Sequence, residues 1–110
     1  MKVLFVDDSR GYLNIIEALL KPFPEIKAVY ATDSETALSK MDGVDAVVTD
    51  YTLVGETGQA VLDISGDRPV YCLTAHTPTV RMPNNFAGVF SKPSDPREWE
   101  RLVDALTSNR

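Results

Sequence analysis

The sequence holds few of the residues that build disulfide-linked or zinc-binding proteins, with one cysteine and one histidine among 110 residues. The lone Cys72 excludes an internal disulfide, and its place in an apolar run predicts a small buried side chain. A structural zinc site needs about four cysteine or histidine ligands, so that class of site is excluded as well. The fold must therefore rest on an ordinary apolar core, which suits a hydrophobic content of 44%.

Long hydrophobic runs are also missing. No stretch approaches the roughly 20 apolar residues that a membrane-spanning helix requires. The chain begins MKVLFVDD, in which acidic residues interrupt the apolar start too early for a secretory signal peptide. We therefore expect a cytoplasmic protein with no membrane partner.

Positive charge is in deficit, because 11 lysines and arginines face 16 aspartates and glutamates, for a net charge of −5. Such a chain lacks the basic surface that attracts nucleic acid, so we expect no nucleic-acid partner. Its length suits one domain, which we take to span residues 1–110.

Short apolar runs and helical spacings alternate along the chain. The runs predict five strands, at residues 3–6, 27–31, 46–49, 70–73 and 88–91. Most of these runs are continuously apolar, which is typical of strands buried on both faces of a parallel sheet.

Helical patterns lie between most of the strands. Residues 10–20 form the first, with Tyr12, Ile15, Ile16, Leu19 and Leu20 at helical spacing. Thr32 and Glu35 have capping-box spacing before a short second helix through Ala37, Leu38 and Met41, and residues 58–64 suit a third. The last begins near Pro96, with a box-like Asp95 and Glu98 and an apolar face of Trp99, Leu102, Val103 and Leu106.

The crossover before the last strand breaks this regularity. Residues 75–87 contain Pro78, Pro83 and two consecutive asparagines, which predict a shortened or irregular fourth helix. The remaining alternation indicates an α/β fold, a doubly wound five-stranded parallel sheet of the flavodoxin-like kind. We adopt the usual strand order of that arrangement, 2-1-3-4-5.

Polar side chains gather where the predicted strands end. Asp7 and Asp8 follow the first strand and Asp50 the third, whereas Thr74 and Ala75 follow the fourth and Lys92 the fifth. Because these strands are neighbours in the expected order, their carboxyl ends meet at one edge of the sheet, where such folds bind ligands.

Three converging carboxylates repel one another unless a cation joins them, and Mg²⁺ prefers such oxygen ligands. Asp8 and Asp50 can ligate the ion directly with the backbone carbonyl of Thr52, and Asp7 can hold a bound water. An ionised Asp50 can also attack phosphorus. Lys92, the Thr74 hydroxyl and the Ala75 N–H can then contact the phosphoryl oxygens.

Each of these residues also has a simpler interpretation. Asp7 and Asp8 suit the cap of a helix N-terminus, Asp50 an ordinary turn, Thr74 a strand-end cap and Lys92 a solvated surface side chain. The joint pattern favours a functional site, because each residue type falls at the end of the appropriate strand.

The segments VLFVDD, AVVTD, CLTA and FSKP resemble response-regulator receiver domains of two-component signalling, and the resemblance covers the whole chain. It implies that Asp50 is the phosphoacceptor, Asp7 and Asp8 the acidic pocket for Mg²⁺, Thr74 the switch hydroxyl and Lys92 the phosphate contact. It also implies a cis peptide bond between Lys92 and Pro93.

The resemblance further implies a signalling protein rather than an enzyme, which catalyses only its own phosphorylation and dephosphorylation. The expected donor is a sensor histidine kinase or a histidine phosphotransfer protein, and the recipient of the signal is a downstream protein that the sequence does not identify. The start at Met1 and the closing helix favour a stand-alone receiver.

One departure from the receiver pattern lies in the last strand. Receivers usually carry tyrosine or phenylalanine three residues before the lysine, and here that position is Val89. Phe90 follows it and is expected to point to the opposite face of the sheet.

Three alternatives to a switching receiver arise. A constitutive interaction module of the same fold is the main one, motivated by Val89 and the irregular crossover. A magnesium-dependent phosphatase with an aspartyl nucleophile is weaker, because Thr52 stands where such enzymes have a second acid. A flavin site is disfavoured by the acidic loop after the first strand.

Overall fold

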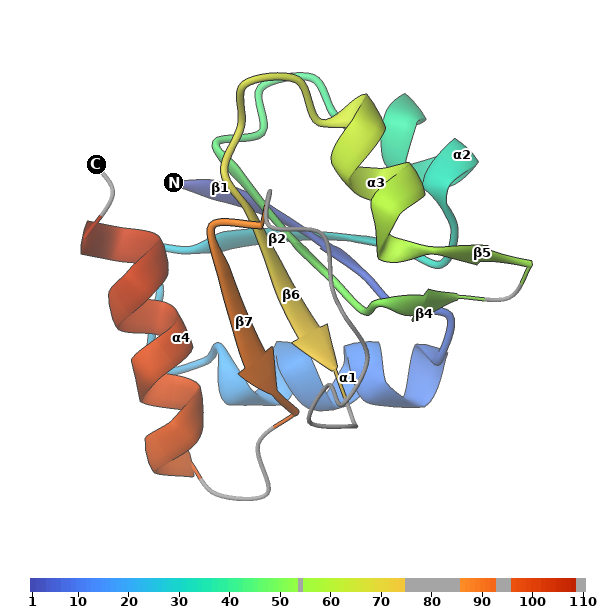
Figure 1. Ribbon diagram of the computed structural model, residues 1–110. Coiled ribbons are helices and arrows are strands. Elements are labelled where there is room, and N and C mark those ends of the chain that lie inside the picture. Colours follow the sequence, from blue (N-terminus) through green and yellow to red (C-terminus); the bar gives the residue numbers. More distant parts are fainter. Residues whose placement is uncertain (54, 75–85, 93–95, 109–110) are drawn as a thin grey trace.

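The computed structural model describes residues 1–53, 55–74, 86–92 and 96–108. Its main sheet is entirely parallel, with the strand order β2-β1-β3-β6-β7 (Figure 1). These strands are β1 (Lys2–Val6), β2 (Lys27–Ala31), β3 (Ala46–Thr49), β6 (Val70–Thr74) and β7 (Gly88–Ser91). The predicted five strands and their 2-1-3-4-5 order are confirmed, with one residue added to the first strand and one to the fourth.

Helices cover both faces of the sheet. They are α1 (Arg10–Leu19), α2 (Ser34–Ser39), α3 (Gly58–Ile64) and α4 (Pro96–Ser108). In Figure 1, α1 and α4 lie on one side of the sheet and α2 and α3 on the other. Residues 75–85 lie outside the described part, and with them the predicted shortened or irregular fourth helix.

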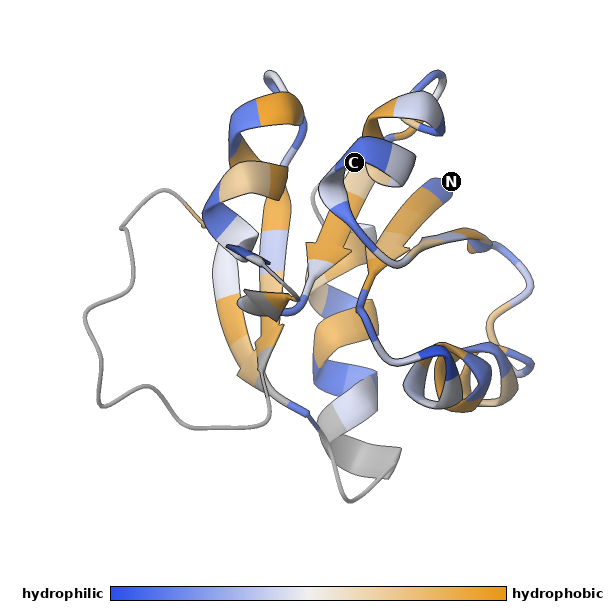
Figure 2. Cartoon of the chain, turned by 90° about the vertical axis from the view of Figure 1, so that its right-hand side faces the viewer, coloured by the Kyte–Doolittle hydropathy of each residue, from blue (hydrophilic) through white to orange (hydrophobic). Residues whose placement is uncertain are grey.

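The buried side chains form two clusters, one on each face of the sheet. Along β1, Val3 and Phe5 face α1 and α4, whereas Leu4 and Val6 face α2 and α3. This period of two within a continuously apolar run is the property expected of a strand buried on both sides. Figure 2 shows the corresponding hydropathy, with strands that are largely apolar and helices with mixed faces.

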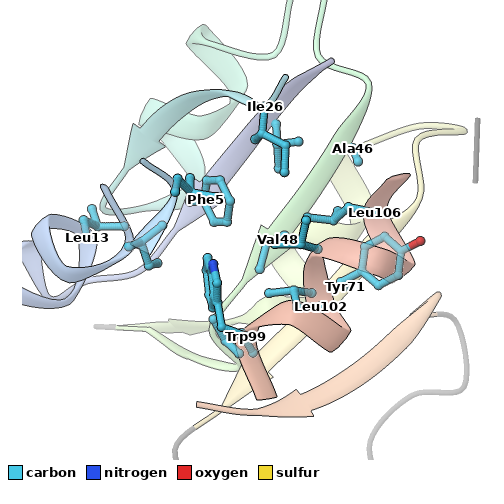
Figure 3. Close-up of a cluster of buried hydrophobic side chains, with 14 residues drawn as sticks. Phe5, Leu13, Ile26, Ala46, Val48, Tyr71, Trp99, Leu102 and Leu106 are labelled. Atoms are coloured by element: carbon cyan, nitrogen blue, oxygen red, sulfur yellow. The ribbon is translucent and has the colours of Figure 1, made fainter. Parts of the chain in front are cut away.

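The larger cluster is built around aromatic rings. Trp99 of α4 is 2% exposed and stacks with Phe5, at a centroid separation of 6.3 Å (Figure 3). The predicted apolar face of α4 is confirmed, since Leu102, Val103 and Leu106 are also buried. Asp95, the first residue of its predicted capping box, lies outside the described residues.

The ends of α1 and α2 differ slightly from expectation. Leu20 caps α1 rather than belonging to it, and Ile15 is 53% exposed, so its assignment to the apolar face was wrong. The cap of α2 is Asp33 rather than Thr32, because Asp33 has an extended backbone and its carboxylate accepts from the Thr36 N–H at 2.7 Å. The second helix was predicted to continue through Met41, but α2 ends at Ser39 and Lys40 is its C-cap, so Met41 lies beyond the helix.

A two-stranded hairpin after β3 was not predicted. It consists of β4 (Thr52–Leu53) and β5 (Glu56–Thr57), and Gly55 occupies a positive φ of 75° in the turn. The Glu56 carboxylate accepts from the backbone N–H of Ser34 at 2.7 Å and from its hydroxyl. The hairpin therefore joins the chain beyond Asp50 to the start of α2.

The longest described helix, α4, has 13 residues. Within the described residues no helix combines the length and the apolar character needed to cross a membrane.

Candidate functional site

The site lies where neighbouring strands end in register. Val6 of β1 pairs with Thr49 of β3, so Asp7 and Asp50 both emerge at the carboxyl edge of the sheet. Thr74, the last residue of β6, pairs with Ser91, the last residue of β7, and Lys92 follows directly. Strand register thus gathers residues that are more than 80 positions apart.

Three carboxylates converge at this edge. One oxygen from each of Asp7, Asp8 and Asp50 lies within 4.8 Å of the other two. Asp7 is 3% exposed and Asp50 is 9% exposed, whereas Asp8 faces solvent. Oxygen ligands of this kind suit a hard divalent cation such as Mg²⁺.

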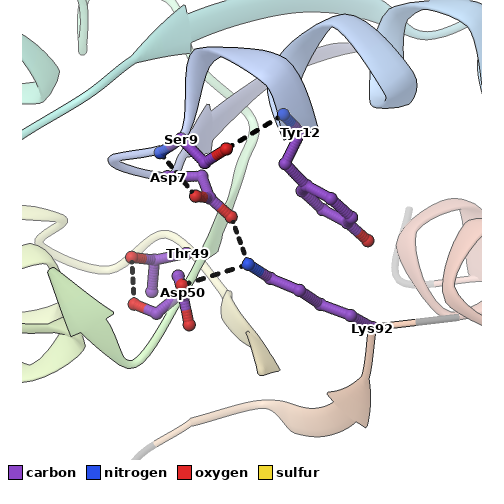
Figure 4. Close-up of polar contacts among 6 residues, drawn as sticks. All are labelled: Asp7, Ser9, Tyr12, Thr49, Asp50 and Lys92. Carbon is purple, nitrogen blue, oxygen red and sulfur yellow. Dashed lines mark hydrogen bonds and ion pairs between the residues drawn. The ribbon is translucent and has the colours of Figure 1, made fainter. Parts of the chain in front are cut away.

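Lys92 bridges the two buried carboxylates (Figure 4). Its Nζ lies 2.7 Å from Asp7 Oδ2 and 3.1 Å from Asp50 Oδ2. Burial lowers the pKa of Lys92, but the hydrogen bond and charge of Asp7 and the charge of Asp50 outweigh it, so the pKa is raised. The lysine is therefore a fixed positive charge at neutral pH.

The backbone holds Asp7 and Asp50 in place. Asp50 N–H donates to the Val6 carbonyl at 2.9 Å, and its own carbonyl accepts from the Thr49 hydroxyl at 2.9 Å. Asp7 Oδ1 accepts from the Ser9 N–H at 2.9 Å. The N-cap of α1 is Ser9, whose hydroxyl accepts from the Tyr12 N–H at 3.2 Å, so neither Asp7 nor Asp8 is the helix cap.

Tyr12 of α1 covers the lysine. The Lys92 Nζ lies 4.3 Å from the centroid of the Tyr12 ring, within the range of a cation–π contact. Burial raises the pKa of Tyr12 to about 12, with the positive charge of Lys92 opposing the negative charges of Asp7 and Asp50. Tyr12 was predicted only as part of the apolar face of its helix, and no pattern along the sequence indicated this contact.

Cys72 of β6 lies beneath the site and is fully buried, as predicted. Burial raises its pKa to about 12, and the negative charge of Asp50 adds to this effect. The thiol is therefore protonated at neutral pH and has the small apolar role expected of it.

Gly58, the first residue of α3, presses against the backbone that carries Asp50. Its N–H donates to the Tyr51 carbonyl at 2.6 Å. A Cβ at this position would lie 2.9 Å from the Asp50 carbonyl oxygen and 3.2 Å from the Tyr51 Cα. Any larger residue must displace the backbone next to the carboxylate cluster, which sequence reasoning did not detect.

We expect Gly58→Ala to lower the free energy of unfolding by about 2 kcal/mol, because overpacking against rigid backbone is costly. Urea denaturation measures the change. Gly11→Ala is the matched control, since its new Cβ would meet only the Ser9 hydroxyl at 3.8 Å and alanine favours the helix. Equal stability of the two variants would show that the backbone around Asp50 and Tyr51 accommodates the added Cβ without cost.

The remaining predicted site residues are placed less completely. Thr52 is the first residue of β4, two positions after Asp50, and pairs with Thr57. Thr74 belongs to β6 rather than following it. Ala75 and Pro93 lie outside the described residues, and so does the predicted cis bond between Lys92 and Pro93.

No protein-family model and no curated protein matches the sequence. Solved structures do match the fold. A CheY-like response regulator receiver domain from Methylobacillus flagellatus superimposes with a TM-score of 0.81 and 20% identity, covering 96% of this chain and 98% of that one. A signal receiver domain of an HD domain-containing protein from Pseudomonas fluorescens Pf-5 superimposes with a TM-score of 0.80 and 26% identity, covering 97% of this chain and 87% of that one. The chain has the fold of response-regulator receiver domains.

A third receiver structure is similar at the level of fold. It is the receiver domain of a sensor histidine kinase from Pseudomonas aeruginosa PAO1, with a TM-score of 0.79, 19% identity and 97% coverage of both chains. That protein has a magnesium ion coordinated in its active site cleft.

Val89 and Phe90 lie on opposite faces of β7, as predicted. Val89 is 43% exposed, at the position where receivers usually carry an aromatic ring. Phe90 lies on the other face, where it packs against the larger core cluster and tilts against Tyr71 at a centroid separation of 6.3 Å. Phe90 is therefore a partly buried side chain at the edge of the core, on the face opposite to Val89.

Proposed function

We propose that residues 1–110 form a single receiver domain that takes a phosphoryl group onto Asp50 in two-component signalling. The arrangement of Lys92 between the carboxylates of Asp7 and Asp50 is the observation that carries this proposal. It sets a nucleophile, a cluster of oxygen ligands and a positive charge within contact distance. Receiver structures with the same fold support it.

In the proposed step, an Asp50 carboxylate oxygen attacks the phosphorus of a phosphohistidine. The new bond joins Asp50 oxygen to phosphorus, and the phosphorus–nitrogen bond of the donor breaks. Its electron pair stays on the donor imidazole, which takes a proton from solvent if it leaves as an anion. No base is needed on the receiver side, because Asp50 reacts as a carboxylate.

The donor set fits Mg²⁺. The carboxylates of Asp7, Asp8 and Asp50 converge. Asp8 and Asp50 would ligate the ion directly together with the Thr52 carbonyl, and Asp7 would hold a bound water. When bound, the ion would neutralise charge that builds up on the phosphoryl oxygens.

Contacts to the phosphoryl group complete the proposal. Lys92 exchanges its contact with Asp50 for a contact with a phosphoryl oxygen. Its ammonium then stays beside the negative oxygens of the group that is being transferred. We assign the Thr74 hydroxyl and the Ala75 N–H to another oxygen, since β6 ends beside Lys92. The domain acts only on its own phosphorylation and dephosphorylation, so it is not an enzyme with an external substrate.

The expected partners follow from this chemistry. A sensor histidine kinase or a histidine phosphotransfer protein supplies the phosphoryl group, and a downstream protein responds to the added charge, about −1.5 to −2 near neutral pH. A cytoplasmic location remains part of this proposal.

Magnesium is expected to stabilise the domain, because a ligand that binds only the folded state adds to its stability. At 100 times the dissociation constant the gain is about 2.7 kcal/mol. We expect Asp8→Asn to lose most of that gain, whereas Asp67→Asn, at an exposed position outside the site, retains it. Chemical denaturation with magnesium or with a chelator measures both, and equal gains in the two variants would place the ion elsewhere.

The direct test of the proposed function is phosphorylation by a small donor. We expect phosphoramidate or acetyl phosphate to label the protein in magnesium and not in a chelator. Equal labelling in magnesium and in a chelator would contradict the role of the carboxylate cluster. Absence of labelling in the presence of magnesium would favour a constitutive interaction module of the same fold.

A further inference from the structure

The Tyr12 ring lies beside the one cation that the described residues place at the site. Its centroid is 4.3 Å from Lys92 Nζ, and the two carboxylates approach the same nitrogen at 2.7 and 3.1 Å. The ammonium therefore contacts oxygen at Asp7 and Asp50 and an aromatic face at Tyr12. Figure 4 shows the ring alongside the lysine chain, with its hydroxyl directed away from the carboxylates.

A contact that restricts the ammonium matters because the lysine side chain is long and flexible. Its four-carbon chain lets the ammonium move freely, and a mobile cation loses more entropy when it contacts a phosphoryl oxygen. The ring of Tyr12 is itself held, since it starts from α1 and packs against the larger core cluster. A fixed aromatic face restricts the ammonium electrostatically without forming a directional hydrogen bond that must be broken.

We propose that Tyr12 is a positioning residue for phosphoryl transfer, which keeps Lys92 next to Asp50 through its aromatic ring. This inference rests on the proposed function of Asp50 and Lys92. When the phosphoryl group arrives, the ammonium turns from a carboxylate oxygen to a phosphoryl oxygen and stays in contact with the ring.

The ring rather than the hydroxyl carries this role. Within the described residues the Tyr12 hydroxyl is buried and finds no hydrogen-bond partner. Tyr12→Phe keeps the aromatic face and removes only this oxygen. Tyr12→Leu keeps an apolar side chain in the same packing position and removes the aromatic face. The two variants therefore separate the aromatic contact from simple packing.

The test measures phosphoramidate labelling rates in magnesium for the wild type, Tyr12→Leu, Tyr12→Phe, Lys92→Met and the double variant Tyr12→Leu/Lys92→Met. We expect Tyr12→Leu to slow labelling by about tenfold, equivalent to ~1.4 kcal/mol, and Tyr12→Phe to restore the wild-type rate. In the Lys92→Met background, Tyr12→Leu should have no further effect, because the ring acts through the lysine.

A spectroscopic measurement without donor tests the contact itself. The Lys92 Nζ lies 4.3 Å from the ring centroid, so the ring current should shift the resonances of the adjacent Cε methylene protons upfield in the wild type and in Tyr12→Phe. They should move downfield in Tyr12→Leu. A purely structural role for Tyr12 predicts no difference between leucine and phenylalanine in the labelling rates and equal losses in both lysine backgrounds.

The outcomes separate the two proposals. If the wild type is not labelled, the proposed function fails and this inference fails with it. If the wild type is labelled and Tyr12→Leu matches it, or slows equally with and without Lys92, the inference alone is overturned.

Discussion

Asp50→Asn is expected to abolish phosphoryl labelling, reducing its rate by about 10³-fold or more, because loss of a nucleophile removes the step itself. Asparagine preserves the size of the side chain, and the backbone bonds of residue 50 to Val6 and Thr49 remain. The variant should therefore fold. Labelling with phosphoramidate in magnesium, followed by intact mass, measures the effect.

The matched control for this variant is Asp67→Asn, which removes the same charge from an exposed position outside the site. It should be labelled at the wild-type rate. Undiminished labelling of Asp50→Asn would move the acceptor to another carboxylate, with Asp7 and Asp8 the nearest candidates.

Lys92→Met is expected to have the second largest effect, a loss of about 10²-fold in labelling rate. The side chain supplies the positive charge that contacts the developing charge on the phosphoryl oxygens, and removal of one such group typically costs this much. Methionine keeps a flexible apolar chain beside Tyr12, so packing changes little. Labelling rates at saturating magnesium measure the loss.

The same variant is expected to change stability in a metal-dependent way. Asp7, with a side chain 4% exposed, loses its ion pair, and without magnesium we expect a loss of about 2 kcal/mol. Magnesium should then stabilise Lys92→Met more than the wild type, because the ion takes over the neutralisation of the carboxylates. Lys21→Met, at an exposed position, is the control. An equal magnesium effect in all three proteins would show that lysine and metal do not share these carboxylates.

The centre of the sheet could be predicted because β1 and β3 are buried on both sides. The run Ala46–Thr49 has three successive apolar residues and is buried at all four positions, and such a run indicates a parallel strand without any tertiary information. Amphipathic helices are harder to place on this basis. Ile15 fits the apolar spacing of α1 but is 53% exposed, because spacing does not determine how far a helix face is covered.

The sequence predicted which residues of the site meet, because their places at the ends of neighbouring strands determine this. Asp7, Asp50 and Lys92 meet because register carries their strands to one edge. Their detailed contacts depend on tertiary packing. The lysine was expected to contact only phosphate, whereas it pairs with both carboxylates, and Tyr12 reaches it from a helix 80 residues away in sequence.

The supporting backbone was equally hidden from sequence analysis. The β4–β5 hairpin has two residues in each strand, too few to give a period-two pattern. At Gly58 the restriction arises because a Cβ there would lie 2.9 Å from the Asp50 carbonyl oxygen, and this close approach exists only in the folded chain.

The central claim is that Asp50 becomes an acyl phosphate, and mass spectrometry of the wild-type protein tests it most directly. After incubation with phosphoramidate and magnesium, we predict a gain in mass of one phosphoryl group that hydroxylamine removes, as expected for an acyl phosphate. Peptide mapping after hydroxylamine should locate the resulting hydroxamate at Asp50. A stable adduct on another residue, or no adduct although magnesium binds, would contradict the account.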